Sequence, residues 1–323
     1  MSAQETLRPF RFGMQTAHVS PSRVRRRQDW VDMVREVDDL GFDVMFVSDH
    51  VDDRIGPLAA MASAAQISDR LRLSYLVLDN DFRHPVALAQ ETASIDILSD
   101  GRFELGIGAG WMEKDYTALG MPFDRGGVRV GRLEESLTVL KQAWAGDPFT
   151  HDGQYYPSVN VQSPLLKPVQ QPHPPIMVGG GGPRMLTIAA QHANIVNVIP
   201  QTEPRQIPGQ PNHKFDDCTP EAFERKIAKV REVAGDRMPE LTLAVNIFSM
   251  VLDDGKVQVD EAPTRHQLIV QAMQGTPWAY RGSVASVADQ MRMYRERYGI
   301  SYFIGLNYSK DAMVHVVAEL AGS

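Results

Sequence analysis

The chain has 323 residues, of which 43% are apolar and 23% charged, an ordinary composition for a globular protein. Its net charge of −7 argues against a nucleic acid or an anionic membrane as a partner. No apolar run approaches the roughly 18 residues of a membrane span, and the first residues lack the apolar stretch of a signal peptide. The single cysteine, Cys218, excludes an intrachain disulfide and fits a reducing compartment, so we expect a cytoplasmic protein.

The first half of the chain alternates apolar, β-rich runs with helical patterns. Strands are predicted at residues 10–16, 43–47, 71–78 and 103–107, and helices at residues 29–40, 58–67, 85–98 and 130–144. Residues 146–175 break the pattern, because they are rich in proline and contain a predicted hairpin around Gly153. We interpret this segment as an insertion in one domain spanning residues 1–323.

Alternation resumes after the insertion. Strands are predicted at residues 176–178, 195–199, 241–252 and 302–306, and helices at residues 183–192, 220–234, 266–273, 284–298 and from 311 onward. Alternating elements imply parallel strands, and eight such units favour a (β/α)8 TIM barrel of the α/β class over an open sheet. Catalytic side chains of such barrels lie at the carboxyl ends of the strands, which makes the residues there the candidates.

Polar residues follow the second and third predicted strands. His50 comes directly after the second strand and is suited to acid–base chemistry at neutral pH, while Asp49 is placed either to fix its tautomer or to accept from a ligand hydroxyl. The alternative is a helix cap beside a solvated histidine. Asp79, Asn80 and Asp81 follow the third strand and either turn the chain toward a ligand or cap the next helix.

The fourth strand runs into a glycine-rich loop, residues 102–120, with the sequence RFELGIGAGWMEKDYTALG. Glycines at 106, 108 and 110 allow a backbone to lie flat against a planar ligand, and Trp111 supplies a rigid wall beside it. The spacing differs from the dinucleotide-binding fingerprint. The alternative is a tight loop after a buried strand.

Four consecutive glycines, residues 179–182, lie between a strand and a helix that begins with Pro183. Backbone N–H groups at a helix start form an anion site, so we expect a phosphate there, with a flexible turn as the alternative. No Lys-Ser/Thr pair follows, which excludes a Walker loop.

These pieces, in this order, resemble the luciferase-like superfamily of flavin- and deazaflavin-dependent oxidoreductases, most closely its branch that uses the deazaflavin coenzyme F420. The resemblance spans residues 10–306 and is carried by FRFGMQT, GFDVMFVSDH, LVLDNDFRHPVALAQETASIDILSDGRFELGIGAGWMEKDYTALG, KPVQQPHPPIMVGGGGPRMLTIAAQHANIVN and YRGSVASVADQMRMYRERYGISYFIGL. It implies a (β/α)8 barrel with an insertion near the middle, no bound metal, and a homodimer.

Position by position, the resemblance also implies cofactor contacts. Asp49 and His50 match residues at the deazaflavin ring, Leu76 and Val77 a non-proline cis peptide bulge behind it, and Asp79 and Asn80 contacts at the ring edge. Ala109, Gly110 and Lys114 lie in the loop after the fourth strand, and the phosphate loop corresponds to Gly179, Gly180, Gly181, Gly182, Arg184 and Met185.

Trp111 departs from the family's sugar-phosphate dehydrogenases, which carry a glutamate proton donor at this position. Trp111 with Glu113 instead resembles members that act on less polar substrates. We therefore expect hydride transfer between F420 and a small organic substrate other than glucose 6-phosphate. His50 is the expected proton donor, and the substrate pocket is expected between the insertion, residues 201–217 and the loop after Leu252. An FMN-dependent monooxygenase and a non-catalytic flavin-binding protein are the alternatives.

Overall fold

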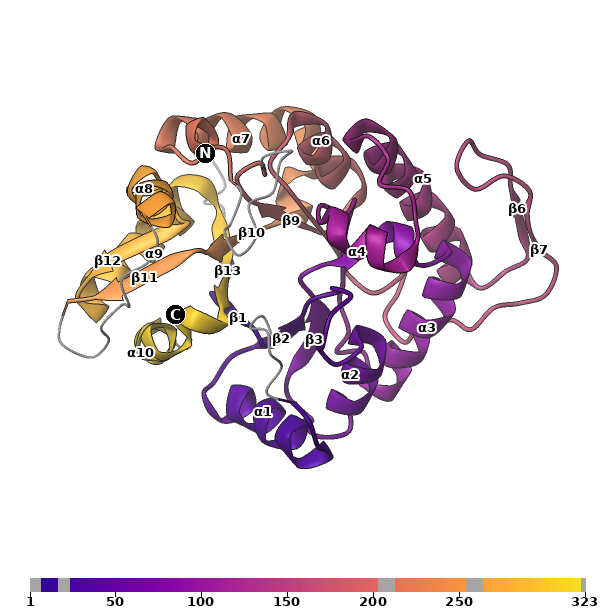
Figure 1. Ribbon diagram of the computed structural model, residues 1–323, viewed down its shortest axis with the longest axis horizontal. Helices are drawn as coiled ribbons and strands as arrows, with labels where there is room; N and C mark the ends of the chain where they lie inside the picture. Colours follow the sequence, from indigo (N-terminus) through magenta and orange to yellow (C-terminus); the bar gives the residue numbers. More distant parts are fainter. Residues whose placement is uncertain (1–6, 17–23, 203–212, 254–263, 321–323) are drawn as a thin grey trace, which may run out of the picture.

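The computed structural model describes residues 7–16, 24–202, 213–253 and 264–320. Nine strands form one parallel sheet that curves into a barrel ringed by helices (Figure 1). These strands are β1 (Arg11–Gln15), β2 (Val44–Val47), β3 (Arg72–Tyr75), β4 (Leu78–Asp79), β5 (Leu105–Gly108), β8 (Ile176–Gly180), β9 (Ile195–Val198), β10 (Thr242–Ile247) and β13 (Ile300–Leu306). Their spatial order is β3-β2-β1-β13-β10-β9-β8-β5-β4, and the predicted barrel is confirmed.

The third barrel strand is interrupted, which divides the predicted strand 71–78 into β3 and β4. A cis peptide bond joins Leu76 to Val77 between the two pieces, as the family resemblance implied. Leu73 of β3 bridges to Phe103, and Leu78 of β4 pairs with Ile107. Both β3 and β4 therefore contact the segment that contains β5, and these contacts close the barrel.

Gly106 and Gly108, two of the alternating glycines, allow the strands to approach closely enough to close the barrel. A Cβ atom at Gly106 would overlap the backbone carbonyl of Tyr75, and one at Gly108 would lie 2.8 Å from Cγ2 of Val77. Gly106 and Gly108 therefore make room for the interrupted strand, which corrects the expectation that they lie against a planar ligand.

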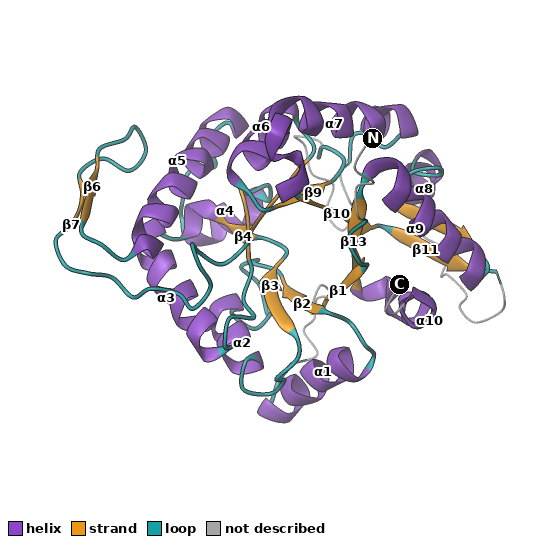
Figure 2. Cartoon of the chain, turned by 180° about the vertical axis from the view of Figure 1, so that it is seen from behind, coloured by secondary structure: helices purple, strands orange, loops and turns teal. Residues whose placement is uncertain are grey.

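Helices cover the outside of the barrel (Figure 2). They are α1 (Arg27–Asp39), α2 (Pro57–Ala64), α3 (Pro85–Leu98), α4 (Glu113–Leu119), α5 (Gly126–Ala145), α6 (Pro183–His192), α7 (Pro220–Ala234), α8 (Thr264–Ala272), α9 (Val284–Tyr298) and α10 (Lys310–Leu320). The short helix α4 was not predicted, because its seven residues fall in a segment interpreted as loop. None of the helices in the described ranges is long and apolar enough to cross a membrane.

Apolar side chains fill the barrel from both sides of the sheet. Inside it lies a cluster made of Val44, Phe46, Met177, Ile195, Ala244, Tyr302 and Ile304. A larger cluster fills the space between strands and helices, and it includes the fully buried Trp144 and Trp278. Cys218 is buried in this layer, and burial raises the pKa of its thiol to about 12.

Two small sheets lie outside the barrel. The predicted strand 241–252 divides into β10 and β11 (Ser249–Leu252), and β11 pairs in parallel with β12 (Ala279–Gly282), a strand the sequence did not predict. Within the insertion, β6 (Phe149–His151) pairs antiparallel with β7 (Val159–Val161), which confirms the hairpin around Gly153. This hairpin projects from the barrel (Figure 2).

Candidate active site

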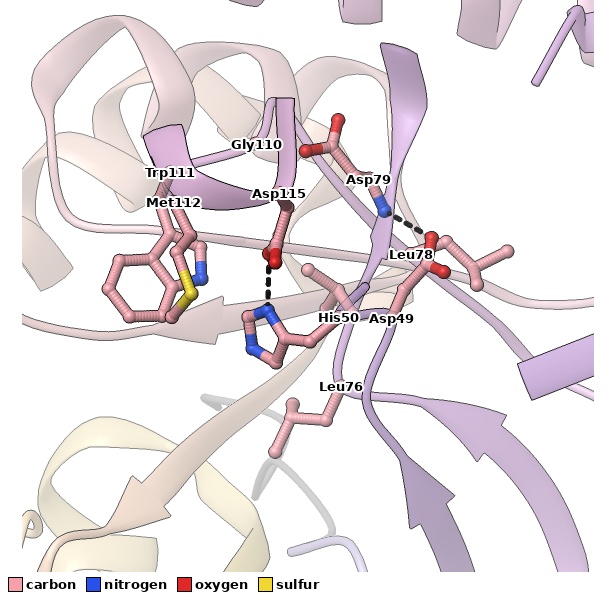
Figure 3. Close-up of a pocket in the computed structure, with 10 residues that line it drawn as sticks. Asp49, His50, Leu76, Leu78, Asp79, Gly110, Trp111, Met112 and Asp115 are labelled. Atoms are coloured by element: carbon pink, nitrogen blue, oxygen red, sulfur yellow. Dashed lines mark hydrogen bonds and ion pairs between the residues drawn. The ribbon is translucent and has the colours of Figure 1, made fainter. Parts of the chain in front are cut away.

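A small pocket, partly open to solvent, lies at the carboxyl ends of β2, β4 and β5 (Figure 3). Its walls come from three segments far apart in the sequence. They consist of Asp49, His50, Leu76, Val77, Leu78, Asp79, Gly110, Trp111, Met112 and Asp115. The structure thus brings together the predicted residues from the ends of the second, third and fourth strands, as expected for a TIM barrel.

His50 is held by a residue that the sequence analysis missed. Its Nδ1 lies 2.7 Å from Oδ2 of Asp115 in α4, and the other oxygen of Asp115 accepts from the backbone N–H of Val51 at 3.2 Å. The edge of the His50 ring meets Trp111, with ring centres 5.8 Å apart. The idea that Asp49 fixes the histidine tautomer is therefore corrected, since Asp115 occupies that place.

Asp49 has different partners. Its two oxygens accept from the guanidinium of Arg83 at 2.6 and 3.0 Å, and one also accepts from the backbone N–H of Asp79 at 3.0 Å. Asp49 is buried, so this fork-shaped pairing compensates a charge that burial would otherwise disfavour. The ion pair also fixes the start of α3 to the end of β2.

The carboxyl group of Asp79 points toward Gly110 and away from His50 (Figure 3). One of its oxygens accepts from the backbone N–H of Asp81 and from the hydroxyl of Tyr116, each at 3.0 Å. Burial raises the pKa of Asp79 to about 6. Gly110 has φ +73°, and a Cβ there would overlap the Tyr116 hydroxyl and the Asp79 carboxylate, so glycine is required here.

Arg129 of α5 holds the loop that contains Ala109 and Gly110. Its guanidinium donates to the carbonyls of Ala109 at 3.1 Å and Gly110 at 3.3 Å, and it stacks over the ring of Phe123 at 3.9 Å. No sequence pattern pointed to this arginine. Lys114, predicted in the same loop, lies in the first turn of α4.

Asn80 is buried beside the pocket. Its amide nitrogen donates to the hydroxyl of Tyr156 at 3.1 Å. Its amide oxygen has no hydrogen-bonding partner in the described part of the chain.

The predicted phosphate loop, Gly179–Gly182, consists of the last two residues of β8 and the two residues that precede α6. Its glycines are not equivalent. A Cβ at Gly180 would lie 2.6 Å from Cβ of Met185, and one at Gly181 would overlap the carbonyl of Ile199. A Cβ at position 179 or 182 would instead make ordinary van der Waals contacts, with nearest atoms 3.7 and 3.9 Å away. The first of these positions lies 4.0 Å from the side chain of Val77, so the loop adjoins the pocket.

Two basic residues surround this loop. Arg184 is half exposed, donates to the carbonyl of Gly127 at 2.8 Å and pairs with Glu134 at 3.2 Å. Lys226, which the sequence analysis missed, is buried and donates to the carbonyl of Gly181 at 2.6 Å. Most of the two loops expected to contact substrate, residues 203–212 and 254–263, lies outside the described residues.

Comparison with known proteins relates this geometry to a family. The sequence model of the luciferase-like monooxygenase family matches residues 9–213. An F420-dependent glucose-6-phosphate dehydrogenase of Microbacterium testaceum is 32% identical over 164 residues, 48% of each chain. The oxygenase component of a flavin-dependent trigonelline monooxygenase of Acinetobacter baylyi is 33% identical over 146 residues, 45% of this chain and 39% of that protein. The chain thus spans about half or less of these relatives.

Solved structures show the same fold over nearly the whole chain. The F420-dependent tetrahydromethanopterin reductase of Methanopyrus kandleri superimposes with a TM-score of 0.72 at 18% identity, covering 97% of this chain and 98% of the reductase. The long-chain alkane monooxygenase LadA also gives a TM-score of 0.72, at 15% identity, with 97% and 91% of the chains covered. The matched sequence model and this shared barrel place the chain in the luciferase-like monooxygenase family.

Proposed function

We propose that the protein is an oxidoreductase that transfers a hydride between coenzyme F420 and a small organic molecule. The observation that carries the proposal is the pocket, in which a histidine faces the interrupted third strand of a luciferase-like barrel. Several relatives that match the chain are F420-dependent dehydrogenases.

The residues present fit a ring cofactor that carries a phosphate. Gly182 precedes Pro183 at the start of α6, and the backbone N–H groups there would hold the phosphate end. Leu76 and Val77 form an apolar wall for the ring. When bound, a deazaflavin supplies or accepts the hydride.

The protein's own residues would orient the reactants and handle the proton. His50 stands at the carboxyl end of β2 and is the group suited to deliver or remove a proton at the substrate. Trp111 is 39% exposed at the rim, where its ring shields the histidine from solvent and forms a wall for substrate.

The pocket also favours a substrate class. Three carboxyl groups line it, from Asp49, Asp79 and Asp115, and no lysine or arginine is among the described residues of its lining. The phosphate group of a sugar phosphate would place further negative charge near these carboxyl groups, which is unfavourable. With the indole of Trp111 and the thioether of Met112 at the rim, the site suits a neutral and less polar substrate rather than glucose 6-phosphate.

An FMN-dependent monooxygenase is the second candidate, favoured by the similarity to the trigonelline monooxygenase component. Both cofactors have a tricyclic ring and a phosphate, so the pocket and the loop suit either. They differ in reaction with oxygen, because the deazaflavin ring carries carbon at the position where the flavin ring carries the nitrogen involved in oxygen activation.

Cofactor titration followed by an oxygen electrode tests the proposal. The purified protein is titrated separately with F420 and FMN while absorbance and fluorescence are followed, and each complex is then reduced. We expect tighter binding of F420 and no oxygen uptake. Tighter binding of FMN with substrate-dependent oxygen uptake would replace the proposal by the monooxygenase, and binding of neither cofactor would refute both.

A further inference from the structure

Asp115 is a buried carboxylate, and both of its oxygens contact the segment that contains His50 and Val51. It belongs to the first turn of α4 and its side chain is 3% exposed. Oδ2 lies 2.7 Å from Nδ1 of His50, and Oδ1 accepts from the N–H of Val51 at 3.2 Å. The carboxylate therefore holds both the imidazole ring and the backbone that follows it.

This contact determines which ring nitrogen serves the pocket. A carboxylate oxygen at 2.7 Å requires a hydrogen on Nδ1, so the neutral ring carries its proton there and presents a lone pair at Nε2. In Figure 3 the His50 ring turns Nδ1 toward Asp115 and lies beneath Trp111. Nε2, on the opposite side of the ring, is the nitrogen that a ligand in the pocket would meet.

The other charged groups near His50 have different partners. Asp49 is paired with Arg83, and the carboxyl of Asp79 is turned toward Gly110 and Tyr116. Among the described residues, Asp115 is therefore the carboxylate in hydrogen-bonding contact with the imidazole. Free histidine gives no such preference for hydrogen on Nδ1, so the tautomer depends on this partner.

We propose that Asp115 is a positioning residue that fixes His50 with hydrogen on Nδ1 and so dedicates Nε2 to proton transfer; this rests on the proposed hydride transfer. When a hydride adds to one substrate atom, the Nε2–H bond of the charged ring breaks and the proton bonds to the adjacent, electron-rich substrate atom. The ring is left neutral, with its remaining hydrogen on Nδ1 shared with Asp115. In the reverse direction Nε2 accepts the proton.

The test reads the tautomer directly, without a substrate. Nitrogen-15 NMR spectra of His50 are recorded, above the titration midpoint of the ring, for the wild type, Asp115→Ala, Asp115→Glu and the control Glu113→Ala. Glu113 is an exposed acidic residue in the same helical turn. We expect hydrogen on Nδ1 in the wild type and the control. Removal of the carboxylate in Asp115→Ala should shift the tautomer ratio toward Nε2–H by roughly tenfold or more.

Asp115→Glu distinguishes positioning from packing, because it keeps the carboxylate and should retain most of the Nδ1–H form. Hydrogen on Nε2 in the wild type, or an unchanged ratio in a folded Asp115→Ala variant, would overturn the inference. F420 and FMN titrations of the same variants separate this result from the proposed function. Failure of the wild type to bind either cofactor would refute the proposed function and leave the tautomer measurement intact.

Discussion

The two sides of the barrel mouth are built differently. On one side, His50, Asp115 and Trp111 meet through side chains that come from β2 and from the segment around α4. On the other, Gly179–Gly182 present backbone, and a Cβ at position 179 or 182 would meet no atom closer than 3.7 Å. The side-chain half suits proton chemistry, whereas the backbone half suits binding of an anion.

This difference predicts which substitutions lower turnover and which weaken cofactor binding. A side chain in the His50 half can be removed without disturbing the barrel, and the loss should appear in turnover. A glycine in the loop carries no side chain to remove, so a useful change adds atoms, and the loss should appear in cofactor affinity. The predictions below test this division.

The largest effect is expected from His50→Ala. Loss of a general acid or base typically lowers rates by about 10²–10⁴, while the phosphate loop and ring wall remain intact. Turnover is measured with reduced F420 and an acceptor identified by screening, and cofactor affinity by fluorescence titration. A rate within a few-fold of the wild type would reduce His50 to a packing residue.

Gly110→Ala should disturb the segment that carries Trp111 and Asp115. The added methyl group overlaps the Tyr116 hydroxyl and the Asp79 carboxylate in a residue whose φ is +73°. We expect about 2–3 kcal/mol of lost stability, measured by urea unfolding, and a disturbed pocket.

Gly120→Ala is the matched control for this substitution. Gly120 also has a positive φ, +67°, but a Cβ there meets nothing within 4 Å. It should cost only the backbone strain, about 1 kcal/mol. Equal losses for the two variants would show that the crowding at Gly110 does not matter.

Gly182→Val probes the backbone half. The new side chain causes no clash at its Cβ but adds bulk where the phosphate is proposed to bind, so the dissociation constant for F420 should rise tenfold or more, about 1.4 kcal/mol. Gly181→Val is a poorer probe, because its side chain would overlap the carbonyl of Ile199 and disturb the fold itself.

Gly56→Val provides the control for Gly182→Val. Gly56 is likewise the residue before a proline at a helix start, in α2, and has no atoms within 4 Å of its added Cβ. Its substitution should leave F420 affinity unchanged. If both variants bind F420 as the wild type does, the phosphate does not sit at the start of α6.

The smallest effect is expected from Asp79→Asn. Because burial raises the pKa of Asp79 to about 6 from 3.8, the folded state holds this proton more tightly than the unfolded chain does. The stability that the protonated group provides is therefore lost as pH rises from about 4 to 6. Asparagine carries no charge, so the variant should gain about 1 kcal/mol relative to the wild type across this interval, a figure reduced by solvent in the open pocket.

Thermal unfolding of both proteins at several pH values measures this difference. A constant difference between pH 4 and 7 would contradict the raised pKa. Arg83→Met is unsuitable as a substitute test, since it would leave the buried carboxylate of Asp49 without its partner.

Sequence analysis predicted the features that depend on local pattern. Strand–helix alternation predicted the barrel, and its eight strand positions were found, although the strand at 71–78 is interrupted and that at 241–252 leaves the barrel after Ile247. Residues following the strands were placed correctly at the pocket because parallel strands bring their carboxyl ends together.

Features that depend on contacts between distant residues were missed. Asp115 lies 65 positions from His50 and Arg83 lies 34 from Asp49, and no spacing rule connects such pairs. The roles of Gly106 and Gly108 were misinterpreted for a related reason: the sequence shows that a side chain is absent but not which neighbour occupies the space.

The exposure of Trp111 has a practical consequence. The other three tryptophans, Trp30, Trp144 and Trp278, are at most 3% exposed, whereas Trp111 is 39% exposed at the pocket rim. Collisional quenchers such as iodide should therefore reach one emitter out of four in the folded protein. The protein thus carries a built-in optical reporter at its own pocket, and a ligand that covers the indole would reveal itself as protection from iodide, without any attached label.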